Sequence, residues 1–311
     1  MTRLFFILLL ALSASASFSS TSHAQSSSIS LWPEGVPGAK NIGPEQVADG
    51  RTSNVSEPTL TFYPAAADRK NGSAVIICPG GGYVRLSTLR EGEQYAHWLS
   101  TLGVSSFVLK SRLAEFGHPA PLQDVLRAIR LVRSSATQYG IDPNRIGVMG
   151  SSAGGHLAAS AGTLFDHPLG RTGTALDSVN ARPDFMILMY PVITMQDPSV
   201  HAGSRKALLG ASPSAESLQL MSLEKQVSST TPPTLLIHTQ NDKTVPVENS
   251  ILFYQALTKA GVPAEMLLFE RGTHGMGMRL GNGNASDWPH RAEEWLRDRK
   301  ILQSDSPSQG K

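Results

Sequence analysis

A serine set among glycines marks the first place in this sequence where chemistry is expected. Positions 150–154 read Gly-Ser-Ser-Ala-Gly, after an apolar run and before a stretch with helical spacing. So sharp a turn between a strand and a helix needs small neighbours and lifts its central side chain out of the sheet. The free N–H groups of the helix start also favour a developing negative charge. We therefore predict that Ser152 is a nucleophile; the alternative is a serine that caps a helix beside packing glycines.

A serine hydroxyl needs a base to take its proton and an acid to orient that base. With a nucleophile at this kind of turn, the order of the three groups along the chain is Ser, Asp, His. Asp242 is the only carboxylate in the loop 239–246, which follows the apolar run 234–238. His274 lies in a glycine-flanked loop after the last apolar run. We expect Asp242 and His274 to complete a catalytic triad with Ser152.

Other carboxylates and histidines are weaker candidates for these two roles. Three aspartates lie closer to the serine in sequence but do not close a strand in the right place: Asp177, Asp184 and Asp197. His156 falls in the helix after the serine and His238 within a strand, so we expect structural or supporting roles for both. The remaining histidines after residue 24 have no placement that favours catalysis: His97, His118, His167, His201 and His290.

A second glycine-rich turn follows an earlier apolar run. Residues 79–83 read Pro-Gly-Gly-Gly-Tyr. Such a turn lets the backbone approach a substrate closely, and with the N–H of Ala153 it would form an oxyanion hole. No Lys-Ser or Lys-Thr follows and the dinucleotide spacing is missing, so a phosphate-binding loop is not predicted.

The elements that must position these groups alternate between strands and helices. This alternation predicts one doubly wound α/β domain, a mostly parallel sheet with helices on both faces. The expected strands are 59–63, 74–78, 104–109, 146–149, 185–190, 234–238 and 265–269. The expected helices are 91–102, 122–139, 155–161, 247–260 and 288–299.

The domain organisation follows from the segments around this pattern. We expect a signal peptide over 1–24, an irregular lead-in over 25–57, the catalytic domain over 58–302 and a disordered tail over 303–311. Two connections, 163–184 and 191–233, are longer than a plain connection needs and are candidates for caps over the site.

Composition excludes several classes of partner. The chain has 311 residues, is 40% hydrophobic and 17% charged, and carries a net charge of +2. Because the lysines and arginines are scattered along the sequence, we expect no basic surface that would bind nucleic acid or an anionic membrane. No pair of ligand residues has zinc spacing and no calcium loop is present, so neither a metal nor another cofactor is expected.

The first residues have the pattern of an export signal. Arg3 precedes the apolar run 4–12, and Ser-His-Ala at 22–24 suits signal cleavage before Gln25. A disordered tail is the alternative. We expect a secreted or periplasmic protein with no membrane association after cleavage. Cys78 is the only cysteine, so no intramolecular disulfide is possible.

The chain resembles bacterial α/β-hydrolase carbohydrate esterases, which remove acetyl and in some members feruloyl groups from xylan or pectin. The resemblance rests on segments spread over most of the mature chain: 31–33, 79–83, 107–110, 112–113, 118–124, 142–150, 204–205, 208–210, 245–246, 249–250 and 274–275. It implies the α/β-hydrolase fold and a cofactor-free ester hydrolase. It also implies Ser152, Asp242 and His274 as the triad and Gly81, Gly82 and Ala153 as oxyanion donors.

Three positions depart from the family pattern. Met276 stands where an aromatic residue is frequent, Thr273 where a second glycine is frequent, and Asn241 where aspartate is common. None belongs to the expected triad, but Met276 would alter the rim of the site.

The preferred function is hydrolysis of acetyl esters on a plant polysaccharide, with an acylated carbohydrate as substrate. A feruloyl esterase or general short-chain carboxylesterase is the alternative, with a serine exopeptidase or a non-catalytic binding protein less favoured. A glycoside hydrolase would need two facing carboxylates, and no acidic pair falls at strand ends.

Overall fold

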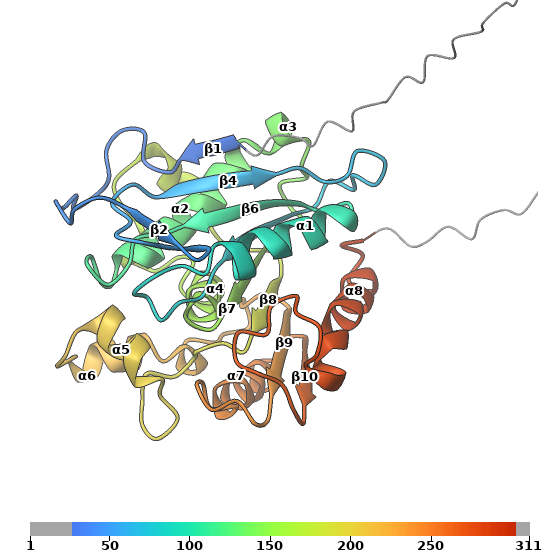
Figure 1. Ribbon diagram of the computed structural model, residues 1–311. Coiled ribbons are helices and arrows are strands. Elements are labelled where there is room, and N and C mark those ends of the chain that lie inside the picture. Colours follow the sequence, from blue (N-terminus) through green and yellow to red (C-terminus); the bar gives the residue numbers. More distant parts are fainter. Residues whose placement is uncertain (1–26, 303–311) are drawn as a thin grey trace, which may run out of the picture.

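An eight-stranded sheet runs through the chain, and only one of its edges is antiparallel (Figure 1). The structure is a computed structural model and describes residues 27–302, so the expected signal peptide and tail lie outside the described residues. At the edge, β1 (Ser27–Ser30) pairs antiparallel with β4 (Thr59–Tyr63), which pairs antiparallel with β6 (Ser105–Lys110). The parallel part continues from β6 through β5 (Ala74–Cys78), β7 (Ile146–Ser151), β8 (Met186–Met189), β9 (Thr234–Thr239) and β10 (Ala264–Phe269).

Helices cover both faces of the sheet, because successive side chains of a strand point to opposite sides. One face packs against α2 (Ala120–Ser134), α4 (Ala153–Thr163) and α7 (Glu248–Lys259), and the other against α1 (Gln94–Thr101) and α8 (Trp288–Asp298). In β5, Ile76 belongs to the first core, whereas Val75 and Ile77 belong to the second. The expected doubly wound α/β-hydrolase architecture is confirmed.

Helix boundaries differ from expectation at two places. The segment expected as one helix over 122–139 is interrupted at Ser135, after which α3 (Ala136–Tyr139) ends at Gly140 with a φ of 62°. Before α1, residues 89–93 form a π-helical turn, η1 (Leu89–Glu93). Hydrophobic periodicity does not report such local changes in winding, because the apolar face continues across them.

The lead-in contains more regular structure than the sequence predicts. Besides β1 it contains β2 (Gln46–Ala48) and β3 (Arg51–Ser53), which form an antiparallel pair. Thr52 and Leu86 exchange two backbone hydrogen bonds of 2.9 and 2.7 Å, so β3 also holds the loop that follows the glycine-rich turn. Strands of three residues are too short to give a period-two signal, so the sequence did not reveal them.

A buried ion pair fastens the lead-in to the domain. The Arg112 guanidinium donates to the Asp124 carboxylate at 2.8 Å, and both side chains are almost completely buried. Trp32 of the lead-in donates its indole N–H to the same carboxylate at 2.8 Å. Arg112 also donates to the carbonyl oxygen of Pro37. Two lead-in residues therefore depend on a charge pair between the end of β6 and α2.

The two expected cap segments pack differently. The stretch 163–184 contains η2 (Pro168–Gly170) and η3 (Ala175–Ser178) and lies against α2, with an Arg130–Asp177 ion pair of 3.2 Å. The stretch 191–233 contains α5 (Ala202–Leu209), α6 (Ala215–Leu220) and η4 (Leu223–Lys225).

Among the helices of residues 27–302, none combines the length and the hydrophobicity that a membrane-spanning helix requires.

Replacement of Asp124 by Asn should lower the free energy of unfolding by about 3–5 kcal/mol, because it leaves the buried Arg112 charge without its partner. Urea denaturation followed by circular dichroism measures this change. The control is Asp197→Asn, which breaks the exposed pair with Arg205 and should cost less than about 1 kcal/mol. Equal losses in the two variants would contradict the proposed importance of the buried pair.

Candidate active site

The turn after β7 holds Ser152 in a backbone conformation that side chains rarely adopt. Its φ is 55° and its ψ is −123°, and it directly precedes α4. The turn is tight enough that a Cβ on Gly150 would lie 2.1 Å from the carbonyl oxygen of Gly154. The N–H of Ser152 donates to the carbonyl oxygen of Met189, and the carbonyl oxygen of Ser152 accepts the N–H of Val192, each bond being 3.0 Å long. The strained conformation is therefore supported on both sides.

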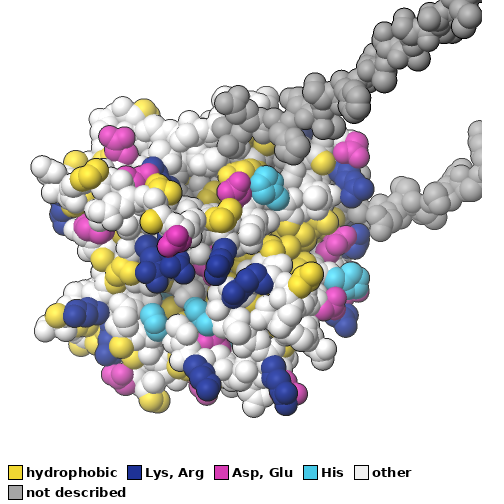
Figure 2. All heavy atoms as spheres, viewed as in Figure 1, with side chains coloured by type: hydrophobic (Ala, Val, Ile, Leu, Met, Phe, Trp, Pro, Cys, Tyr) yellow, Lys and Arg dark blue, Asp and Glu magenta, His cyan; other side chains and the backbone are white. Residues whose placement is uncertain are grey.

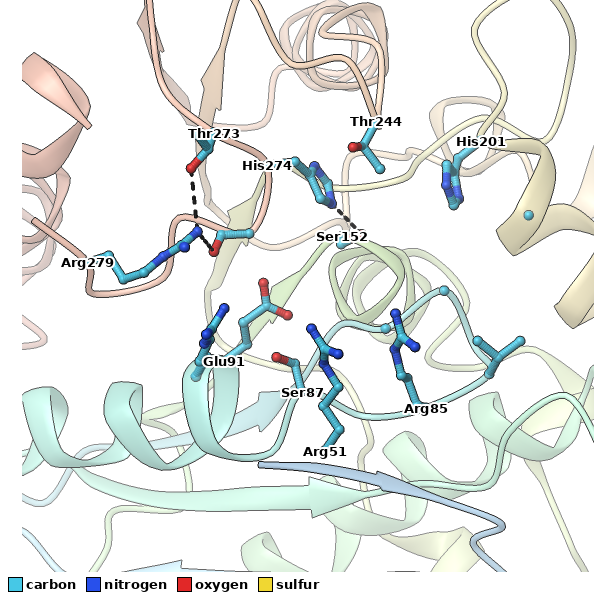
Figure 3. Close-up of a pocket in the computed structure, with 16 residues that line it drawn as sticks. Arg51, Arg85, Ser87, Glu91, Ser152, His201, Thr244, Thr273, His274 and Arg279 are labelled. Carbon is cyan, nitrogen blue, oxygen red and sulfur yellow. Dashed lines mark hydrogen bonds between the residues drawn. The ribbon is translucent and has the colours of Figure 1, made fainter. Parts of the chain in front are cut away.

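The structure brings the three expected triad residues together from the ends of three strands. The Oγ of Ser152 lies 2.9 Å from Nε2 of His274, and Nδ1 of His274 lies 2.7 Å from Oδ2 of Asp242 (Figure 3 shows the serine and histidine). The carboxylate accepts the proton on Nδ1, which leaves Nε2 free to accept the Ser152 hydroxyl proton. This arrangement can activate a serine hydroxyl.

A second histidine supports Asp242. Nε2 of His238 lies 3.2 Å from the carbonyl oxygen of Val245, which can only accept, so Nε2 carries the proton. That nitrogen lies 3.5 Å from Oδ2 of Asp242, whose other oxygen accepts the N–H groups of Thr244 and Val245. Burial would raise the pKa of Asp242, but hydrogen bonds from His238 and His274 outweigh it and hold this pKa well below its usual range. Asp242 therefore stays ionised, and His238 has the supporting role expected of it.

The glycine-rich turn lies directly against the serine turn. A Cβ on Gly154 would come within 2.1 Å of the carbonyl oxygen of Cys78, and one on Gly80 within 2.6 Å of that of Ser151. Gly81 has a φ of 135°, and a Cβ there would meet the carbonyl oxygen of Arg85 at 2.1 Å. Only glycine therefore permits this contact.

The expected oxyanion donors flank the serine. Gly81 and Gly82 line the same cavity as Ser152. Ala153 is the first residue of α4, so its N–H has no acceptor within the helix. The three backbone groups are thus available near the serine.

Glu91 is a buried carboxylate of the site that the sequence did not reveal. Its Oε2 accepts the Gly80 N–H at 3.0 Å and its Oε1 accepts the Tyr190 hydroxyl at 2.7 Å. The ring of Tyr190 packs edge-on against His274, with centroids 4.9 Å apart. Burial raises the pKa of Glu91, and the Tyr190 hydrogen bond partly offsets this. The sequence offers no signal for this role, because a glutamate in a helical first turn is commonplace.

The cavity above Ser152 has a volume of about 640 Å³ (Figure 3). Most of its remaining lining is basic or hydroxylic: Arg51, Arg85, Ser87, Arg90, His201, Thr244, Thr273 and Arg279. Of the two expected cap segments, 191–233 contributes His201 and Gly203, whereas 163–184 contributes no lining residue because its contacts are with α2. Only the longer segment covers the site.

His201 lines the cavity, a position that the sequence did not predict, although no contact within residues 27–302 gives it a catalytic role. It caps α5 and lies near Thr244 at the cavity (Figure 3). Its Nδ1 accepts the backbone N–H of Ser204 at 3.2 Å, so in the neutral ring Nε2 carries the proton. Burial lowers the pKa of His201, followed by the effect of His274, which keeps it a neutral hydrogen-bond donor.

His156 joins three parts of the site. Its Nδ1 lies 2.8 Å from the Tyr83 hydroxyl after the glycine-rich turn, and its Nε2 lies 2.9 Å from the carbonyl oxygen of Met221. Burial lowers its pKa to about 4 from an ordinary value of 6.5. It is therefore a neutral structural group, as the sequence predicts.

The sequence offered no metal-binding pattern, and within residues 27–302 no three His, Cys, Asp or Glu side chains are grouped to hold a metal ion. Cys78 is buried, and burial raises the pKa of its thiol. It behaves as a small core residue.

Replacement of Glu91 by Gln should lower kcat by about 10- to 100-fold with a smaller effect on KM. The amide has one acceptor oxygen, so either the Gly80 N–H or the Tyr190 hydroxyl loses its acceptor and the glycine-rich turn shifts. Steady-state kinetics with p-nitrophenyl acetate measure the effect. The control is Glu93→Gln, two residues along, whose half-exposed side chain faces His97. An unchanged kcat in Glu91→Gln would contradict the positioning role.

The free energy of unfolding should decrease as the pH falls from about 7.5 to about 5, and protonation of His156 in the unfolded chain should cause part of this decrease. In this range the unfolded chain binds a proton at His156 that the folded protein excludes, so the loss is about 2 kcal/mol from this residue. Urea denaturation at both pH values measures it, and His156→Gln should have a shallower pH dependence. His97→Gln, at an exposed position, should retain the wild-type dependence. Parallel curves for wild type and His156→Gln would refute this assignment.

Two named proteins are similar in sequence to about three quarters of this chain. The chain is 38% identical over 241 residues to endo-1,4-beta-xylanase B of Butyrivibrio fibrisolvens, covering 76% of this chain and 37% of that one. It is 35% identical over 240 residues to an acetylxylan esterase of Xylanibacter ruminicola, covering 75% and 47%. The chain thus spans less than half the length of either relative.

Two solved structures have a similar fold, and one protein family matches more than half of the chain. An acetyl ester-xyloside bifunctional hydrolase from Caldicellulosiruptor lactoaceticus superposes with a TM-score of 0.81 at 40% identity, covering 91% of this chain and all of that one. A carboxylesterase from Lactobacillus plantarum superposes with a TM-score of 0.69 at 26% identity, covering 84% and 99%. Residues 60–257 match the family described as BD-FAE. The chain therefore belongs to the BD-FAE family of α/β-hydrolases.

Proposed function

We propose that the chain is a serine carboxylic-ester hydrolase that removes acetyl groups from a plant polysaccharide, xylan or pectin, or from its oligosaccharides. One observation carries this proposal: Ser152, His274 and Asp242 form a continuous hydrogen-bonded chain that opens into a cavity. The names of the relatives, an acetylxylan esterase and an acetyl ester-xyloside hydrolase, support the choice of substrate.

The geometry implies an acyl-enzyme mechanism. The Ser152 oxygen attacks the ester carbonyl carbon while Nε2 of His274 takes its proton. The carbonyl oxygen becomes negative and accepts hydrogen bonds from backbone N–H groups of the glycine-rich turn and Ala153. His274 then returns the proton to the departing sugar hydroxyl. Water, activated by the same nitrogen, releases acetate and restores Ser152.

The surroundings of the cavity suit an extended carbohydrate. A neighbouring cavity of about 760 Å³ shares the lining residues Val84 and Gly203 with the cavity above the serine. Its wall includes Phe116 and the half-buried His118. Two adjoining cavities would accommodate more than one sugar unit beside the reacting ester.

Alternative functions fit these features less well. A feruloyl or general short-chain carboxylesterase would use the same triad and remains the second candidate. A glycosidase needs two facing carboxylates, whereas Glu91 is the one carboxylate that lines the cavity among the described residues. A non-catalytic binding protein would not need a complete Ser-His-Asp chain.

We also propose that the protein is secreted or periplasmic. The charged Arg3, the apolar run 4–12 and the small residues before Gln25 support this proposal. Mass spectrometry of the protein from its native host should give a mature N-terminus near Gln25.

Replacement of Ser152 by Ala should lower acetate release from acetylated xylan at least about a thousandfold, because the nucleophile is lost. Acetate is quantified by mass spectrometry, with acetylated pectin and feruloylated arabinoxylan assayed in parallel. The control is Ser178→Ala, at an exposed position in η3. Acetate release that survives in Ser152→Ala would refute the mechanism, and ferulate without acetate would favour the second candidate.

A further inference from the structure

Four arginines surround the mouth of the cavity that contains Ser152. Arg51, Arg85, Arg90 and Arg279 all line this cavity, and all four are exposed. Figure 2 shows Lys and Arg side chains gathered near the middle of this face, beside histidine side chains. For a chain with a net charge of only +2, this is a marked local concentration of positive charge.

None of the four arginines forms a salt bridge within residues 27–302, although the charge of Arg279 lowers the pKa of Glu91 to some extent. Arg279 donates instead to the carbonyl oxygens of Gly275 and Met276, at 2.7 and 3.2 Å. By contrast, Arg112, Arg130 and Arg133 each pair with an aspartate. Arg279 thus supports the histidine loop, whereas no ion pair among the described residues explains the positions of Arg51, Arg85 and Arg90.

The single carboxylate in the described lining does not neutralise them. Even when ionised, Glu91 supplies one negative charge against four positive ones, and its oxygens accept hydrogen bonds from the Gly80 N–H and the Tyr190 hydroxyl. Glu91 is also buried, whereas the four arginines are exposed. The mouth therefore keeps a net positive charge.

The arginines come from separate parts of the chain. Arg51 lies in β3 of the lead-in, Arg85 after the glycine-rich turn, Arg90 in η1 and Arg279 after the histidine loop. In Figure 3 Arg51 and Arg85 point into the cavity from one side and Arg279 approaches from another. A guanidinium group donates two parallel hydrogen bonds that fit a carboxylate.

We propose that this mouth binds a carboxylate on the sugar side of the ester, so that the preferred substrate is an acetylated saccharide bearing a uronic acid. The exposed position of the arginines supports the sugar side, because the acetyl group must lie deep beside Ser152 while the sugar lies at the opening. The inference rests on the proposed esterase function and narrows its substrate class.

Binding of deacetylated ligands tests the subsite without requiring any reaction. Titration calorimetry compares xylotriose with the same trisaccharide carrying one glucuronic acid branch. We expect the acidic ligand to bind roughly tenfold more tightly at low salt. The preference should shrink as ionic strength rises from about 0.01 M to about 1 M, where screening is nearly complete. Equal affinities for the two ligands at low salt would overturn the inference.

A double variant that removes two charges tests whether the arginines cause the preference for the acidic ligand. In Arg51→Gln/Arg85→Gln the ratio of the two affinities should fall towards one. The control Lys259→Gln removes the same type of charge from an exposed position at the end of α7 and should keep the wild-type ratio. A double variant that retains the full preference would overturn the assignment to these side chains.

Kinetic measurements test the carboxylate-binding subsite and the proposed esterase function separately. The ratio of kcat/KM for acetylated oligosaccharides with and without the uronic acid should follow the ratio of affinities. Tight binding of the acidic ligand without acetate release would refute the esterase function and not the subsite. A preference for p-nitrophenyl hemisuccinate over p-nitrophenyl acetate, with no preference among the saccharides, would place the carboxylate on the acyl side and overturn the inference.

Discussion

The close approach of two backbone turns is the constraint on which the rest of the site depends. β5 and β7 are parallel neighbours, with Cys78 opposite Gly150, so the turns that follow them emerge side by side at one edge of the sheet. They touch without side chains between them, because Gly80 and Gly154 leave no room for a Cβ. This contact puts the free N–H groups of one turn beside the serine of the other. The buried Glu91 then holds the first turn from behind, through the Gly80 N–H.

Buried histidines join the loops around this contact. His156 connects the segment after the glycine-rich turn to the cap, and His238 connects the Asp242 loop to Ser250 of α7. In each ring one nitrogen faces a carbonyl oxygen, which can only accept, and the other faces a hydroxyl group. Each ring therefore hydrogen-bonds to two separate segments and connects them inside the core. The loops that hold the reactive groups are thereby tied to their neighbours.

Ser152, Asp242 and His274 could be found from the sequence because each follows a recognisable apolar strand, and the carboxyl ends of parallel strands meet at one edge. The architecture could be predicted for the same reason, since continuous apolar runs such as β5 are typical of strands covered on both faces. Glu91 and His201 could not be found in this way. Their roles come from contacts between segments distant in sequence, which leave no periodic pattern along the chain.

The lead-in illustrates a separation between the parts of the molecule that react and the parts that select. It is attached through Trp32 to the Arg112–Asp124 pair and through Thr52 to Leu86, and it carries Arg51 to the edge of the cavity. The hairpin of β2 and β3 lies outside the main sheet, so its exposed residues, such as Arg51, can change without disturbing the core. In evolutionary terms, relatives built on this scaffold can diverge in the molecules they accept through substitutions in a peripheral hairpin, while the reacting groups remain the same.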